Sequence, residues 1–281
     1  MAEEHEIKNM ALFCDFENIA LGVREAKYPQ FDIRRVLERL LLKGSIVVRK
    51  AYSDWERYKD FKAVMHEAAF ELIEIPHVRQ SGKNSADIRM VVDALDLCYT
   101  KGHVDTFVII SGDSDFSPLV AKLRENNKLV IGVGVKKSTS DLLMAACDEF
   151  IYYDDLVMEA ARKKRKSRKP AKPETAKEPP MPKQKKTDED KRQEALDLTL
   201  ETVEALQSER GDEPVWGSMV KQALKRRKPG FNESYYGFRS FSSLLEEAEH
   251  QGLLKLERDQ RSGGYIIHEV EEEETAHPRS N

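Results

Sequence analysis

Aspartates at the ends of two apolar runs are the residues of this chain best suited to chemistry. Asp15 ends the run MALFCD and is soon followed by Asn18, while Asp113 and Asp115 follow the run TFVIISG. Asp87 lies between the two runs. An unbroken apolar run that stops at polar residues is typical of a buried parallel strand, which delivers side chains to one edge of a sheet. We therefore expect the four carboxylates to gather at one edge.

Four carboxylates gathered at one sheet edge would need a positive partner. At a separation of about 5 Å and an effective dielectric of about 20, each pair of like charges costs roughly 3 kcal/mol. Three such pairs approach the whole stability of a domain, which is on the order of 5–15 kcal/mol. A hard divalent cation fits carboxylate oxygens best. The pattern therefore points to phosphoryl-transfer or phosphodiester chemistry.

Each aspartate also has a purely structural interpretation. Asp15 and Asp115 would cap the helices that follow them, and Asp87 would lie in a first helical turn, where the helix dipole favours a carboxylate whatever its function. Two features favour function. Gly112 lets the backbone turn tightly, so that Asp113 and Asp115 can both face the strand end. The loop before Asp87 follows a strand and opens at the same sheet edge.

Polar and basic neighbours extend the candidate site. Asn18 is a supporting polar group, and Ser111 is a candidate to orient a water molecule or a phosphate. The seven histidines show no paired ligand spacing, which argues against zinc. Cations in loops at the same edge suit a polyanionic substrate, although such runs are also common on solvated surfaces. These candidate contacts are Arg79, Lys83, Lys136 and Lys137.

Composition indicates a soluble protein with more than one domain. The 281 residues suffice for one medium and one small domain, and 40% apolar residues can form a real core. Cys14, Cys98 and Cys147 lie in apolar surroundings without CxxC spacing, which predicts buried free thiols. The sequence has no run of 18 apolar residues and no signal-peptide pattern at its start. We therefore expect a cytoplasmic protein with no membrane partner.

Apolar runs alternate with amphipathic helical patterns from Met10 to about Tyr153. The predicted strands are residues 11–16, 45–52, 72–78, 106–111, 129–135 and 150–153. The predicted helices are residues 32–43, 60–71, 86–100, 117–126 and 140–146. This alternation predicts an α/β fold, a parallel sheet with helices on both faces. Ligands of such sheets bind beyond the carboxyl ends of the strands, where the strand order reverses. Placing the first and fourth strands side by side would bring the carboxylates together.

The second half of the chain predicts a linker and a small domain. We assign residues 1–160 to the first domain and residues 161–193 to a basic disordered linker, because the latter are rich in Lys, Arg and Pro. The linker's basic cluster has two interpretations, sequence-blind attraction of RNA, which we favour, or a nuclear import signal. Residues 194–270 predict three helices and a two-stranded hairpin, a winged-helix domain, and residues 271–281 form an acidic tail.

Residues 10–155 resemble an NYN domain of the LabA-like group, a branch of the PIN-like, Rossmann-like nuclease fold. The resemblance rests on Asp15 with Asn18, on Lys83 with Asp87, on the motif SGDSDF, and on Ser140 with the later ACDEF. It implies a ribonuclease that depends on Mg²⁺ or Mn²⁺. The acidic set that the resemblance implies as catalytic and metal-binding is Asp15, Asp87, Asp113 and Asp115.

Residues 194–270 are similar to an OST-HTH domain, also called LOTUS. The similarity is carried by VWGSMVKQALKRRKPGFNESYYGFRSFSSLLEEAE and by the closing LLKLE and GGYIIHE segments. It implies binding of RNA or docking of a protein. Basic side chains with interleaved aromatics favour single-stranded RNA, whereas Phe238 and Phe241 are expected in the core. The candidate RNA contacts are Lys221, Lys225, Arg226, Arg227, Tyr235 and Tyr236.

Together these patterns predict a metal-dependent ribonuclease with a tethered RNA-binding module. Two alternatives remain open. One is a non-catalytic RNA-binding regulator that keeps the acidic pocket, since some relatives of such nucleases bind RNA without cutting it. The other is a scaffold whose C-terminal module docks a protein.

Overall fold

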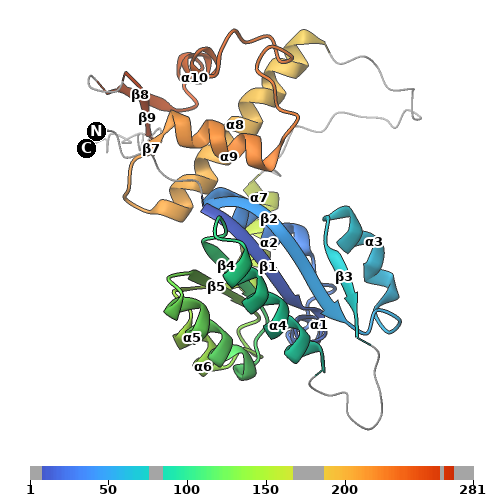
Figure 1. Cartoon of the computed structure of the whole chain (residues 1–281). Helices are drawn as coiled ribbons and strands as arrows, with labels where there is room; N and C mark the ends of the chain where they lie inside the picture. Colours follow the sequence, from blue (N-terminus) through green and yellow to red (C-terminus); the bar gives the residue numbers. More distant parts are fainter. Residues whose placement is uncertain (1–7, 76–84, 167–186, 260–262, 269–281) are drawn as a thin grey trace, which may run out of the picture. The chain divides into compact units, whose positions relative to one another are not determined.

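The chain divides into two compact units, with the division between residues 174 and 175. The computed structural model describes residues 8–75, 85–166, 187–259 and 263–268. Figure 1 shows the whole chain, coloured along the sequence.

The N-terminal unit is built on a six-stranded sheet in the order β3-β2-β1-β4-β5-β6. All five neighbouring pairs are parallel. The strands are β1 (Lys8–Asp15), β2 (Gly44–Ser53), β3 (Glu71–Glu74), β4 (Thr106–Ile110), β5 (Leu129–Gly134) and β6 (Glu149–Tyr152). The predicted parallel α/β fold is thus confirmed.

The strand order reverses between β1 and β4, which are direct neighbours. Their register pairs Met10 with Thr106 and Cys14 with Ile110. Strands β2 and β3 extend the sheet on one side of this pair, and β5 and β6 extend it on the other. In open parallel sheets the crevice beyond the carboxyl ends at such a point is the usual binding site. The residues that follow β1 and β4 therefore meet there.

Helices cover both faces of the sheet (Figure 1). Successive residues of a strand point to opposite faces, so Met10, Leu12 and Cys14 join one buried core while Ala11 and Phe13 join the other. This double burial explains why the strands read as continuous apolar runs. The first core contains residues of α1 (Phe16–Glu25), α2 (Ile33–Lys43), α3 (Lys59–Glu67) and α7 (Tyr153–Lys166). The second contains residues of α4 (Ser85–Thr100), the 3₁₀ turn η1 (Ser114–Phe116), α5 (Ser117–Glu125) and α6 (Asp141–Ala146).

Two helices of this unit, α1 and α7, are not among the helix ranges predicted from the sequence. α1 starts at Phe16, directly after β1, so no loop separates strand from helix, and Gly22 weakens its helical pattern. α7 runs to Lys166, inside the predicted linker. Its Lys, Arg, Ala and Met residues are good helix formers although they give little apolar periodicity.

The C-terminal unit combines three helices with a small antiparallel sheet, as expected for a winged helix. Its elements are α8 (Asp188–Arg210), β7 (Val215–Trp216), α9 (Gly217–Arg227), α10 (Phe241–His250), β8 (Lys255–Arg258) and β9 (Tyr265–His268). The predicted two-stranded hairpin is confirmed as the antiparallel pair β8–β9, and β7 adds a third strand that was not predicted, in the order β7-β9-β8. β7 has two residues, too few to show an alternating pattern.

Helix α8 begins earlier than predicted. Thr187 and Asp190 form a capping box, in which each side chain accepts a hydrogen bond from the backbone N–H of the other. This cap fixes the helix start six residues before residue 194, within the predicted linker. The C-terminal core includes Leu196, Val203 and Leu224, and Phe238 and Phe241 are buried as predicted.

The structure tests the prediction that the three cysteines are buried free thiols. All three cysteines are free, and Cys14 and Cys98 are buried, whereas Cys147 is partly exposed because it ends α6 at the surface. Within the described ranges, no helix is long and apolar enough to cross a membrane.

Candidate active site

Asp15 is held rigidly at the end of β1. Its side chain caps α1, where Oδ1 accepts a hydrogen bond from the backbone N–H of Asn18 at 3.2 Å. Its Oδ2 accepts a hydrogen bond from the Ser111 hydroxyl at 3.0 Å. Only 7% of the residue is exposed. A carboxylate held from both oxygens in a buried position has a fixed direction.

Ser111 and Asn18 tie the ends of β1 and β4 together. The Asn18 side-chain oxygen accepts a hydrogen bond from the Gly112 N–H at 2.9 Å, and the Asp113 N–H donates to the Ser111 hydroxyl at 3.2 Å. Ser111 is fully buried. The structure therefore uses Ser111 to position Asp15, and not as a group open to solvent.

Gly112 is required by the close approach of another loop. A Cβ atom at this position would lie 2.5 Å from the backbone oxygen of Ser138. The Gly112 carbonyl also accepts a hydrogen bond from the Ser140 N–H at 2.9 Å. The turn after β4 is thus packed against the loop after β5, and a larger residue would displace the aspartates that follow.

Asp113 and Asp115 lie in the turn after β4. Asp113 caps η1, with Oδ1 accepting a hydrogen bond from the Asp115 N–H at 3.0 Å. The cap is therefore Asp113, and not Asp115 as in the structural interpretation of the sequence. Asp115 is exposed and Asp113 is half-buried.

Each of the four aspartates affects, or is affected by, the charge of at least one of the others. Burial raises the pKa of Asp15 to about 7, and the charges of Asp87 and Asp113 add to the effect, against the hydrogen bonds from Asn18 and Ser111. Burial also raises the pKa of Asp87 to about 6, with contributions from Asp113 and Asp115. Side chains from β1, α4 and the turn after β4 thus act on one another, as expected from the strand order.

The chemistry of this group fits a hard divalent cation. Every donor is a carboxylate oxygen, and the pKa values of Asp15 and Asp87 are raised by burial and by the neighbouring carboxylates. Across the residues that the structure describes, no three such side chains stand close enough together to hold an ion as they are. Binding would therefore need side-chain rotation or water-mediated contacts, for which the exposed Asp115 and half-buried Asp87 have room.

Glu17 and Arg57 lie beside the aspartates, and neither was predicted from the sequence as a site residue. The charge of Glu17 contributes to the raised pKa of Asp87. Glu17 forms an ion pair with Arg57 at 3.1 Å, and the Arg57 side chain is 52% exposed. Arg57 lies in the turn after β2, which ends at Ser53, so the segment SDWER after a predicted strand was the available signal.

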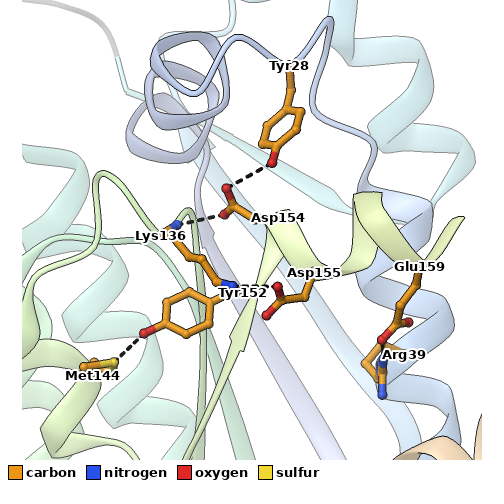
Figure 2. A network of polar contacts seen from close by, with 8 residues as sticks. All are labelled: Tyr28, Arg39, Lys136, Met144, Tyr152, Asp154, Asp155 and Glu159. Carbon is orange, nitrogen blue, oxygen red and sulfur yellow. Dashed lines mark hydrogen bonds and ion pairs between the residues drawn. The ribbon is translucent and has the colours of Figure 1, made fainter. Parts of the chain in front are cut away.

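Of the four basic residues predicted at this edge, the structure describes two. Arg79 and Lys83 lie outside the described residues. Lys136 forms an ion pair with Asp155 at 2.6 Å, and its backbone N–H donates to Asp154 at 2.8 Å (Figure 2). Lys136 and Lys137 are both exposed, but Lys136 is paired with the start of α7.

Some of the basic residues predicted to contact RNA in the C-terminal unit pair with carboxylates of the same unit. Lys221 forms an ion pair with Glu233 at 3.0 Å, and Arg227 forms one with Glu201 at 2.7 Å. Burial lowers the pKa of Arg226. Lys225 is exposed.

Tyr235, Tyr236 and Phe231 form an aromatic cluster in this unit. Tyr235 is 62% exposed. Tyr236 meets its ring edge-on at 5.0 Å and stacks on Phe231 at 5.1 Å. Lys191 lies 5.6 Å from the Tyr235 ring centre. An open ring beside a cation is suited to stacking with a base next to a phosphate.

Two family models match the chain. The model of the NYN domain matches residues 9–155, and that of the OST-HTH/LOTUS domain matches residues 197–265. These are the two domains that the sequence resembles.

Two individual proteins are similar to part of this chain. An uncharacterized protein of Methanocaldococcus jannaschii is 28% identical over 169 residues, which cover 59% of this chain and 63% of that protein. The chain thus spans less than two thirds of this curated relative. A crystal structure of a protein of unknown function from Vibrio parahaemolyticus is 28% identical, with a TM-score of 0.49, and the match covers 56% of this chain and 98% of that one.

The buried charge of Asp15 predicts a pH-dependent stability in the absence of metal. Because its pKa rises from 3.8 to about 7 on folding, the folded state binds the proton more tightly. Stability should therefore fall as pH rises through this range, and each pKa unit corresponds to about 1.4 kcal/mol. With EDTA present, Asp15→Asn should raise the melting temperature more at pH 8 than at pH 5, because only part of the cost is present at pH 5.

Asp60→Asn is the matched control, since Asp60 is an exposed first-turn carboxylate of α3. It should leave the melting temperature unchanged at both pH values. An Asp15→Asn variant destabilised equally at pH 5 and pH 8 would show that the charge of Asp15 carries no such cost.

Proposed function

The chain belongs to the NYN domain family, and from that premise we propose that it is a ribonuclease that depends on Mg²⁺ or Mn²⁺. NYN domains are PIN-like nucleases, and OST-HTH/LOTUS domains bind RNA. The observation that supports catalysis in this chain is the mutual electrostatic effect of Asp15, Asp87 and Asp113 at the point where the strand order reverses.

Four aspartates would hold the metal, directly or through water. When bound, the ion would lower the pKa of a water molecule and neutralise charge that develops on the phosphate oxygens. The protein's own part is to keep Asp15 in a fixed direction through Ser111 and Asn18. The metal-binding set in this proposal is Asp15, Asp87, Asp113 and Asp115.

Arg57 would contact the RNA backbone next to the acidic site. Its guanidinium is half-exposed and paired with Glu17, whose charge reaches Asp87. A phosphate can replace Glu17 as the partner of Arg57, because both offer paired anionic oxygens. Lys137, Arg79 and Lys83 remain candidate contacts from the sequence.

The C-terminal unit would hold single-stranded RNA near the nuclease. The exposed ring of Tyr235 offers a stacking surface. Lys225 offers charge, as does Lys191, which also pairs with Asp188 of its own helix at 2.8 Å. A tethered second binding module raises the local concentration of the substrate without any new contact at the active site.

A non-catalytic RNA-binding protein is the second candidate function. It is supported by the finding that, among the described residues, no metal-ligand set is already assembled. In a variant of this candidate, the C-terminal module docks a protein instead of RNA. Asp15 is buried and held by hydrogen bonds to both of its oxygens, which favours the nuclease, because an RNA-binding surface has no need of a buried carboxylate.

Purified protein should cleave single-stranded RNA with Mg²⁺ or Mn²⁺, and EDTA should stop it. Asp113→Asn should lower the cleavage rate at least about 100-fold, because a lost metal ligand forfeits several kcal/mol of transition-state stabilisation. The exposed Asp60→Asn should cleave at the normal rate. Full cleavage by Asp113→Asn would place the activity elsewhere.

Arg57→Ala should weaken RNA binding and reduce its salt dependence. Loss of one phosphate contact to a single strand lowers the slope of log affinity against log salt by about 0.7. Arg124→Ala is the matched control, because Arg124 is 49% exposed, pairs with Asp148 at 2.9 Å, and lies before β5 at the opposite sheet edge. If both variants had the same slope of log affinity against log salt, Arg57 would not contact the RNA backbone.

Tyr235→Ala should lower RNA affinity about 5- to 150-fold, as expected for one lost base-stacking contact of about 1–3 kcal/mol. Tyr235→Phe keeps the ring and should bind normally. Fluorescence anisotropy with a labelled single-stranded oligonucleotide measures both. Unchanged affinity in the alanine variant would favour the protein-docking alternative for this module.

A further inference from the structure

Helix α4 exposes an apolar stripe at the surface of its unit, although Leu95 also packs against the core and the Tyr99 hydroxyl accepts a hydrogen bond from Asn126 at 3.4 Å. Ile88, Val92 and Tyr99 are 62%, 56% and 64% exposed, and Leu95 between them is partly buried. Steps of four, three and four residues place these side chains along one line of the helix. The opposite side, with Met90, Ala94 and Leu97, fills the core. Figure 1 shows α4 on the outside of the sheet.

Charged residues of both signs border this stripe. Arg89 and Asp96 are exposed one position after Ile88 and Leu95, respectively, so they lie along the same side of it. A shallow groove runs past them along the helix. Its lining residues are Ser85, Ile88, Arg89, Val92, Asp93 and Asp96.

We propose that this stripe binds the same stripe of a second copy of the chain, with the two α4 helices antiparallel about a two-fold axis. In this register Ile88 meets Tyr99 of the second copy, and Val92 meets its Leu95. The same alignment brings Arg89, which also pairs with Asp93 of its own helix at 3.1 Å, next to Asp96 of the second copy, twice by symmetry. A two-fold interface requires such self-complementarity.

The composition of the stripe favours a second copy over RNA. Ile88, Val92 and Leu95 are aliphatic and offer neither charge for phosphates nor flat rings for bases, so Tyr99 is the one ring in the stripe. Apolar side chains at steps of three and four are typical of helix–helix contacts. α4 has 16 residues and is thus about 24 Å long. A contact of this length is small beside a standard interface of about 1,600 Å² in total, so we expect a weak, concentration-dependent dimer.

Sedimentation velocity of the full chain tests the stripe. The wild type should shift from the mass of one chain to that of two as its concentration rises. Val92→Glu should stay monomeric at every concentration, because it buries a charge at the centre of the stripe. Met158→Glu is the matched control, since Met158 is 53% exposed on α7, and it should still dimerise.

A charge exchange tests the register. Arg89→Glu and Asp96→Arg should each weaken the dimer at least about 10-fold, because each places like charges together twice. The combined variant should restore it. Circular dichroism would show that each variant is folded.

Three results would overturn the proposal: a wild type that is monomeric at its highest concentration, a dimer that survives Val92→Glu, or no recovery in the combined variant. Protection of α4 from hydrogen exchange by RNA, with no dimer, would assign the stripe to RNA. RNA cleavage is not measured in these tests, so their failure leaves the ribonuclease proposal standing.

Discussion

The burial of one carboxylate against its like-charged neighbours is the constraint on which the site depends. Asp15 is almost fully buried at the end of β1, and the charges of Asp87 and Asp113 act on it. Burial and repulsion both disfavour its ionised form, and only two hydrogen bonds oppose them. A protein tolerates such a cost where the charged form has a use, and binding a cation is the use that oxygen ligands of one sign suggest.

The fold supplies the means to sustain this cost. Pairing of β1 with β4 brings Ser111 beside Asp15 and Gly112 beside Asn18, so the hydrogen bonds that fix the carboxylate cross between residues more than ninety positions apart. Rigidity is uneven across the site. Asp15 is fixed from both oxygens, while Asp87 is only half-buried in the first turn of α4. A site of this kind can adjust its outer ligands around a fixed inner one.

The sequence predicted the elements better than it predicted their partners. Strands buried on both faces read as apolar runs, so the six strands and the polar residues at their ends were visible in the sequence. Long-range pairing was not. The sequence does not show that Lys136 pairs with Asp155 or that Glu17 pairs with Arg57, because those contacts depend on how loops from different strands meet. The segment SDWER after a predicted strand indicated only that Arg57 could lie at this edge. β7 escaped notice because two residues cannot show a period.

The central claim is that the aspartates at this edge together bind a divalent cation. Crystals soaked in Mn²⁺ and measured near the manganese absorption edge test it most directly, since anomalous scattering locates the ion without any assumption about activity. We predict a strong anomalous peak among Asp15, Asp87 and Asp113, lost in crystals of Asp113→Asn. Wild-type crystals with no peak at this edge, or with the ion bound elsewhere, would contradict the account.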